Sequence, residues 1–146
     1  MEVGRSRQGI SVSQCKYVLE LLHETGMSGC RPSDTPMDPN VKLKARTEEE
    51  TVNREQYQRL VGKLIYLTHT RPDISYAVSR VSQFLTDPSV GHMNAVHRIL
   101  RYLKEDPGKG LFFKKTINRS VEVFTNADWA RSQNDRKSTS GYCSFV

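Results

Sequence analysis

The chain has 146 residues, of which 36 % are hydrophobic, and 22 Lys and Arg side chains outnumber 16 Asp and Glu side chains to give a net charge of +6. This length allows one domain or two partial domains, and no apolar run approaches the length of a transmembrane helix or a signal peptide. The cysteines are widely spaced and form no Cys-x-x-Cys pair, which argues against a zinc site and a disulfide framework. We expect an intracellular protein with no membrane partner. Its charge suits DNA or RNA, although a merely soluble basic surface explains it equally well.

A β-hairpin and one helix are predicted at the start of the chain. Residues 1–14 alternate between apolar and polar side chains around a turn at Gln8-Gly9. Residues 15–25 carry apolar side chains on one helical face, and Gly26 is placed to cap the end of that helix.

A proline-rich connector and a long helix follow. Residues 27–46 are expected to be extended, because proline removes hydrogen-bond donors and disfavours helix before it. The helix is predicted at about 48–68, with glutamates in its first turn; Asn53 would cap it if the regular helix starts later. Its apolar stripe consists of Tyr57, Leu60, Val61, Leu64 and Thr68.

Two further helices are predicted before the chain changes character. One opens at Thr70, whose hydroxyl is expected to cap it, with Pro72 in its first turn, and Asp87-Pro88 ends it. The next covers about 89–104. The inward faces of the two are Ile74, Ala77, Val78, Val81 and Leu85, and Met93, Val96, Leu100 and Leu103. The row expected to point outward on the second consists of Arg98, Arg101 and Lys104.

After the turn at Asp106-Pro107-Gly108 the pattern indicates strands instead of helices. The predicted strands are Leu111–Phe113, Val121–Thr125 and Thr139–Phe145. The fold class is therefore α+β, with helices in the middle and an incomplete sheet at each end.

Two motifs identify a family. The first is Tyr57–Thr68 (YQRLVGKLIYLT) with Arg71–Val78 (RPDISYAV), and the second is Phe124–Ala130 (FTNADWA) with Asp135–Cys143 (DRKSTSGYC). Both resemble the copia-type (Pseudoviridae-like) retrotransposon polyprotein, in which the first belongs to the reverse-transcriptase thumb and the second opens RNase H. Further segments in the same order are Gly9–Gln14, Asp34–Pro39 and Arg98–Leu103, so the resemblance covers nearly the whole chain.

The resemblance implies a division of the chain. Residues 1–26 resemble the end of the palm, with a hairpin similar to the primer grip, followed by the first thumb helix. Residues 27–46 form the connector, 47–104 the thumb and connection helices, and 105–146 a truncated start of RNase H. The implied fold is a helical thumb-like bundle between an N-terminal β-hairpin and an incomplete RNase H-like sheet. The implied partners are an RNA–DNA or DNA duplex and the rest of the polyprotein.

One face of the thumb-like helix is the main candidate site. Gln58, Gly62, Tyr66 and His69 lie together beside the apolar stripe. A glycine inside a helix costs about 1 kcal/mol relative to alanine, and close approach of another backbone would explain it. In retroviral thumbs, which this helix resembles, such a face follows the minor groove of the primer–template. The likeness implies that Gly62 admits the duplex, Gln58 hydrogen-bonds to it and Tyr66 packs on a sugar.

Alternatives remain open for each of these residues. Gly62 could instead ease helix–helix packing, with Tyr66 as a core residue. Arg98 and Arg101 could contact phosphates, but a solvated helix face explains that row as well. No other class of enzyme is indicated, because the histidines lack metal-ligand spacing.

The family's catalytic carboxylates are absent or substituted in this sequence. Polymerase and RNase H chemistry both use carboxylates that hold two Mg²⁺ ions. The chain has no Asp-Asp pair, and Asn126 occupies the position of the first RNase H aspartate in the family. An amide brings no negative charge, and Asp128 is not expected to replace it. We therefore expect no catalysis and no metal bound by this chain.

The resulting expectation is a non-catalytic piece of a copia-type reverse transcriptase with residual primer–template binding. A recruited nucleic-acid-binding protein without catalysis is one alternative, and an unstable pseudogene product without function is another. Fragments of this kind resemble open reading frames in plant nuclear and mitochondrial genomes. No clear transit peptide is present, so the compartment, the host and the oligomeric state stay open.

Overall fold

The computed structural model describes residues 1–41, 43, 52–115, 122–128 and 139–145. Expectations that concern other residues, such as the glutamates at 48–50 and Trp129, lie outside this part of the chain. The chain forms two compact units, Met1–Phe113 and Lys114–Val146.

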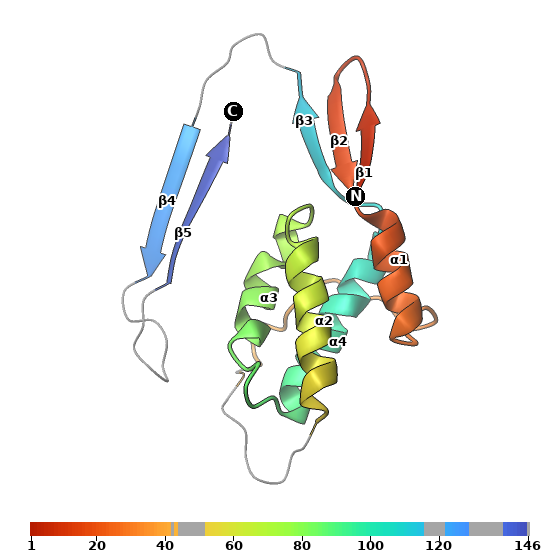
Figure 1. Ribbon diagram of the computed structural model, residues 1–146, viewed down its shortest axis with the longest axis vertical. Helices are drawn as coiled ribbons and strands as arrows, with labels where there is room; N and C mark the ends of the chain where they lie inside the picture. Colours follow the sequence, from red (N-terminus) through yellow and green to blue (C-terminus); the bar gives the residue numbers. More distant parts are fainter. Residues whose placement is uncertain (42, 44–51, 116–121, 129–138, 146) are drawn as a thin grey trace. The chain divides into compact units, whose positions relative to one another are not determined.

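The regular elements follow one another in the order strand, helix, strand, which is compatible with an α+β class (Figure 1). The helical part of the first unit is preceded by two strands and followed by a third. The elements of the first unit are β1 (Glu2–Arg5), β2 (Gly9–Ser13), α1 (Cys15–Glu24), α2 (Arg54–Leu67), the 3-10 turn η1 (Pro72–Ile74), α3 (Ser75–Ser82), α4 (Val90–Glu105) and β3 (Leu111–Lys114). Those of the second unit are β4 (Glu122–Asp128) and β5 (Thr139–Phe145).

The helices of the first unit pack around one hydrophobic core, in which α4 contacts α1, α2 and α3. Each helix buries the face that its periodicity predicts, and Tyr17, Thr68 and Leu85 are half-buried at the edges of that core. The buried core residues are Val18, Leu21, Leu22, Tyr57, Leu60, Val61, Leu64, Leu67, Ile74, Ala77, Val78, Val81, Met93, Val96, Ile99, Leu100 and Leu103. No helix in the described ranges is long and apolar enough to cross a membrane.

The ends of the helices confirm some predictions and correct others: α3 ends at Ser82, earlier than the predicted end at Asp87-Pro88. Asn53 is extended, and its side chain accepts a hydrogen bond from the Gln56 backbone at 2.9 Å, so α2 begins at Arg54 and the predicted start near 48 is wrong at residues 52 and 53. Gly26 adopts φ +67° after α1, where its N–H and that of Met27 donate to the last turn. This Schellman motif is the glycine cap that the sequence predicts.

The predicted cap at Thr70 is wrong. Its hydroxyl donates to the Gln14 side-chain oxygen at 2.8 Å, and both residues are buried. A 3-10 turn with Pro72 at its first position precedes α3, and the N-cap residue Arg71 makes no side-chain cap. The bond satisfies the buried Gln14 side-chain oxygen, whereas the Gln14 amide nitrogen is buried without a hydrogen-bond partner.

The N-terminal hairpin belongs to a three-stranded sheet in the order β1-β2-β3 (Figure 1). β1 and β2 are antiparallel, with Val3 opposite Val12. The turn lies one step earlier than predicted, because the Ser6 N–H donates to the Gly9 carbonyl at 2.9 Å and Gly9 begins β2. A Cβ at Gly110 would lie 2.2 Å from the Val12 carbonyl oxygen, so glycine lets the chain pass close to β2 just before β3.

The second unit contains the antiparallel pair β4 and β5. In this register the backbone of Asn126 lies opposite Gly141, and Asp128 lies opposite Thr139. The bounds predicted for β5 are confirmed, and β4 extends further toward the C-terminus than predicted.

Candidate nucleic-acid interface

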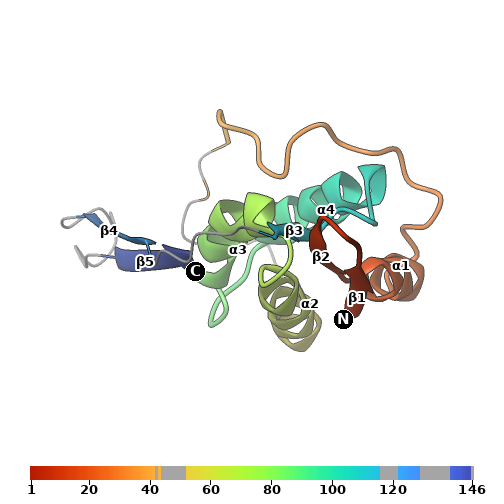
Figure 2. The ribbon, with the colours of Figure 1, turned by 90° about the horizontal axis from the view of Figure 1, so that it is seen from above.

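One face of α2 is exposed over its whole length, opposite the side that enters the core. The predicted group Gln58, Gly62, Tyr66 and His69 lies on this exposed face. Ile65, which is 43 % exposed, lies beside them. Figure 2 views α2 nearly along its axis, with one side toward α3 and α4 and the other open. The sequence therefore predicted the exposed face correctly.

Gly62 leaves bare helical backbone on this face. A Cβ built at Gly62 would meet nothing within 4 Å. The interpretation that this glycine eases helix–helix packing is therefore wrong for the part of the chain that the structure describes. Gly62 therefore lowers the stability of the helix, and no packing contact among the described residues explains why a glycine is there.

Tyr66 lies next to Gly62 on the face and is not a core residue. It is 42 % exposed, and its ring packs edge-on against Tyr17 of α1 with centroids 5.3 Å apart. The centroid of the His69 ring lies 5.9 Å from that of the Tyr66 ring, and the His69 Nδ1 is 2.9 Å from the Tyr66 carbonyl oxygen. At the start of the face, Gln58 donates from its amide to the Leu85 carbonyl at 2.8 Å.

Helix α1 contributes residues to this surface that the sequence did not point to. Tyr17 supports the Tyr66 ring, and burial raises the pKa of its hydroxyl. Two turns further along α1, Glu24 accepts a hydrogen bond from Lys63 and lies 3.5 Å from the Arg59 guanidinium. The hydrogen bond from Lys63 holds the pKa of the Glu24 carboxyl below its usual range. Their seven-residue spacing puts Tyr17 and Glu24 on one helical face, but it does not reveal the partner.

The basic row of α4 is not the outward-facing edge that the sequence predicts, because the connector lies against it. Arg98 donates to the Thr35 hydroxyl at 2.8 Å and to the Thr35 carbonyl at 3.2 Å. Its guanidinium also lies 3.9 Å from the Asp38 carboxylate. Lys104 donates to the Cys30 carbonyl at 2.6 Å. These side chains are half-buried and already have acceptors.

Arg101, between them, is also half-buried. Its backbone carbonyl accepts from the Ser33 N–H at 3.3 Å, and its side-chain Nε is buried without a hydrogen-bond partner. Contact of Arg98 and Arg101 with phosphates stays a prediction, and it would require the connector to move.

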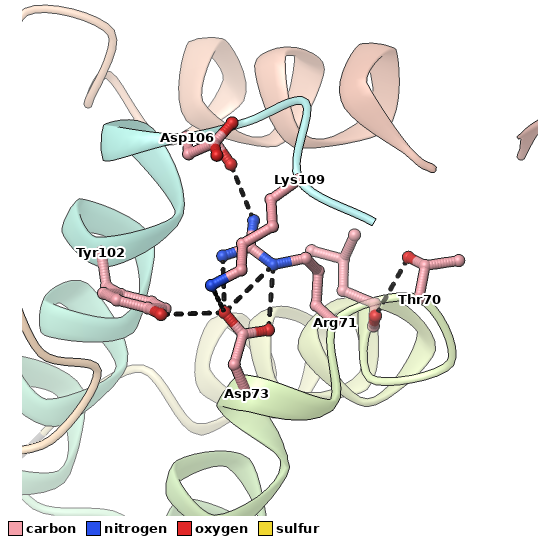
Figure 3. Close-up of polar contacts among 7 residues, drawn as sticks. Thr70, Arg71, Asp73, Tyr102, Asp106 and Lys109 are labelled. Atoms are coloured by element: carbon pink, nitrogen blue, oxygen red, sulfur yellow. Dashed lines mark hydrogen bonds and ion pairs between the residues drawn. The ribbon is translucent and has the colours of Figure 1, made fainter. Parts of the chain in front are cut away.

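The Arg-Pro-Asp motif forms a buried ion pair instead of an exposed site (Figure 3). Arg71, which is 2 % exposed, donates to both carboxylate oxygens of Asp73 at 3.0 and 2.9 Å. It also donates to the Asp106 carbonyl at 2.8 Å and lies over the Tyr102 ring. Asp73 accepts in addition from the Tyr102 hydroxyl at 2.8 Å and pairs with Lys109 at 3.3 Å.

Partial burial raises the pKa of Asp73, but hydrogen bonds from Arg71, Tyr102 and Lys109 outweigh it and hold the pKa far below its usual range. The carboxylate is therefore charged at neutral pH and fully engaged. Because Arg71 also holds the Asp106 carbonyl, the cluster fixes the turn that leads from α4 to β3. We assign this motif a structural role.

No group of at least three His, Cys, Asp or Glu side chains that could hold a metal ion occurs among the described residues. The structure places the backbone of Asn126 in β4, but the side chains of Asn126 and Asp128 are outside what it describes.

Known proteins resemble this chain closely in sequence. It is 42 % identical over 146 residues to the retrovirus-related Pol polyprotein from transposon RE1 of Arabidopsis thaliana, and 40 % identical to that from transposon RE2 of the same plant. Each match covers the whole chain but 10 % of the polyprotein. An uncharacterized mitochondrial protein of Arabidopsis thaliana is 42 % identical over 82 residues, which are 56 % of this chain and 74 % of that protein.

The relatives from transposons RE1 and RE2 define the class as retrovirus-related Pol polyproteins of transposons. This chain belongs to the copia-type retrotransposon Pol polyproteins, as its motifs predicted. It spans about a tenth of the length of the curated polyproteins that it matches. No family model and no solved structure matches the chain.

Proposed function

We propose that this chain is the thumb and connection region of a copia-type reverse transcriptase, leading into the first strands of RNase H. In this proposal it binds the primer–template duplex through the exposed face of α2 and catalyses neither polymerisation nor RNA cleavage. The observation that carries the proposal is Gly62, an exposed helical glycine with nothing within 4 Å of its Cβ position. A backbone that comes close to α2 from outside would explain it.

The surroundings of Gly62 support the same partner. Gln58 and Tyr66 lie one turn before and one turn after it on the exposed face. Gln58 uses one amide N–H for the Leu85 carbonyl, so its second N–H and its oxygen, together with the Tyr66 ring, are the groups that would meet sugars and base edges. The net charge of +6 favours a polyanion.

Binding of a fluorescent RNA–DNA hybrid tests the proposal. Gly62→Val places a branched side chain where the duplex would approach, and we expect it to weaken binding about tenfold, which corresponds to about 1.4 kcal/mol. Gly91→Val is the matched control, because Gly91 is also an exposed helical glycine and its Cβ would make only an ordinary 3.6 Å contact with Ser89. Circular dichroism must show equal helix content in both variants. Equal binding by the two variants would contradict the groove-facing assignment of Gly62.

The absence of catalysis has its own test. Metal-bridging carboxylates are needed at both catalytic centres, and Asn126 supplies none. We expect no cleavage of the RNA strand of a hybrid with Mg²⁺ or Mn²⁺ by these 146 residues, and Asn126→Asp should not restore it, because a single added carboxylate does not hold two metal ions. Metal-dependent cleavage above that of a mock preparation would refute this part of the proposal.

A further inference from the structure

Glu24 of α1 connects two cations of α2. One of its carboxylate oxygens accepts from Lys63, and the other lies 3.5 Å from the Arg59 guanidinium. All three side chains reach solvent, with exposed fractions of 39 % for Glu24, 28 % for Lys63 and 60 % for Arg59. A second anion can therefore reach both cations without unfolding any element.

The two cations lie beside the face proposed to meet the duplex. Arg59 precedes Gly62 by three residues and is its neighbour on the helix surface, and Lys63 follows Gly62 directly in the chain. Helix α1 lies along this surface through the Tyr17–Tyr66 ring contact at one end and through Glu24 at the other. The surface around Gly62 thus includes side chains from both helices.

We propose that Arg59 and Lys63 form a binding site for the sugar–phosphate backbone of the duplex, and that Glu24 occupies the phosphate position in the free protein. This inference rests on the proposed function and names the contact that lies beside Gly62. A phosphodiester and a carboxylate are both singly charged anions whose oxygens accept from guanidinium and ammonium groups. Exposed ion pairs contribute little to stability, so a phosphate can displace Glu24 at small cost. Glu24 aligns the two cations and limits non-specific attraction.

Neutralising Glu24 tests this directly. Glu24→Gln removes the competing charge, so we expect the hybrid to bind about two- to fivefold more tightly in low salt, the range set by the modest strength of exposed ion pairs. The slope of log affinity against log salt concentration should steepen by about 0.9 for each additional phosphate engaged. Glu20→Gln is the matched control. It makes the same charge change at an exposed position of the same helix, where Glu20 is 3.9 Å from Lys16, and it should change both quantities less.

A second set of variants ties the effect to the two cations. Adding Arg59→Gln and Lys63→Gln to Glu24→Gln should abolish the gain and return the salt slope to that of the unaltered chain or below it. Glu24→Gln and Glu20→Gln with equal effects would overturn the inference, since only net charge would then matter. If that result appears while Gly62→Val still weakens binding, the proposed function stands without this contact. A chain that binds no hybrid at all overturns both.

Discussion

Gly62 has no side chain on the exposed face of α2. The effect of this residue on folding can therefore be measured separately from any effect on binding. Alanine favours a helix interior over glycine by about 1 kcal/mol, and the space around Gly62 is open to 4 Å. We expect Gly62→Ala to raise the free energy of unfolding by about that amount, measured by urea denaturation. A loss of stability would reveal a contact at Gly62 within the folded chain.

The Asp73 carboxylate makes the free energy of unfolding depend on pH. Its pKa in the folded chain is held below that of the unfolded chain, so its stabilising contribution is complete above the unfolded value of about 4 and declines as pH falls through the folded value. Asp73→Asn leaves the buried Arg71 without a counter-charge, which costs about 3 kcal/mol at neutral pH. The difference between the variant and the unaltered chain, followed by denaturation, should shrink below pH 4 and vanish only in strong acid. A difference independent of pH would show that the carboxylate charge plays no part.

At the scale of elements, the connector has no regular structure in residues 27–41, yet its residues hold the basic row of α4. The hydrogen bonds come from side chains of the helix to carbonyl and hydroxyl groups of the connector, which needs no repeating pattern. The connector is not extended throughout as predicted, because backbone hydrogen bonds close turns from Met27 to Cys30 and from Asp38 to Val41.

Removing those side chains should release the connector. Arg98→Ala removes the hydrogen bonds to Thr35, and Lys104→Ala removes the one to Cys30. For each variant we expect faster hydrogen exchange and proteolysis at residues 30–38, with a small change in overall stability of about 1 kcal/mol or less. Arg80→Ala is the control, because Arg80 contacts Gln83 within its own region. If the connector is equally protected in all of these variants, its contacts with α4 are not what holds it.

At the scale of the whole molecule, the two units differ in what supports them. The helices of the first unit share one core, whereas the described strands of the second unit pair only with each other. A two-stranded sheet alone is marginally stable in water. We expect strong hydrogen-exchange protection in α2 and α4 and weak protection in β4 and β5. Equal protection in both units would show that the second unit has a stable core of its own.

The sequence by itself determined the elements and the exposed face of α2. Apolar residues recur with the helical period, so the buried sides of the helices follow from it, and Gln58, Gly62 and Tyr66 lie opposite the core for the same reason. The sequence motifs also identified the family, because a motif is recognised from the order of its residues and not from their neighbours in space. The sequence did not determine the start of α2, because Asn53 and the glutamates before it are both suitable for a helix N-terminus.

Only the tertiary structure decided which side chains meet across elements. Glu24 contacts Lys63 across 39 residues of sequence, and Arg98 contacts Thr35 across 63. Periodicity says which side of a helix is buried but not which segment covers the other side, so the connector on α4 could not be foreseen. Arg71 is the clearest case. An arginine is rarely buried, and it is buried here because Asp106 and Tyr102 come next to it, and to its sequence neighbour Asp73, only in the folded chain.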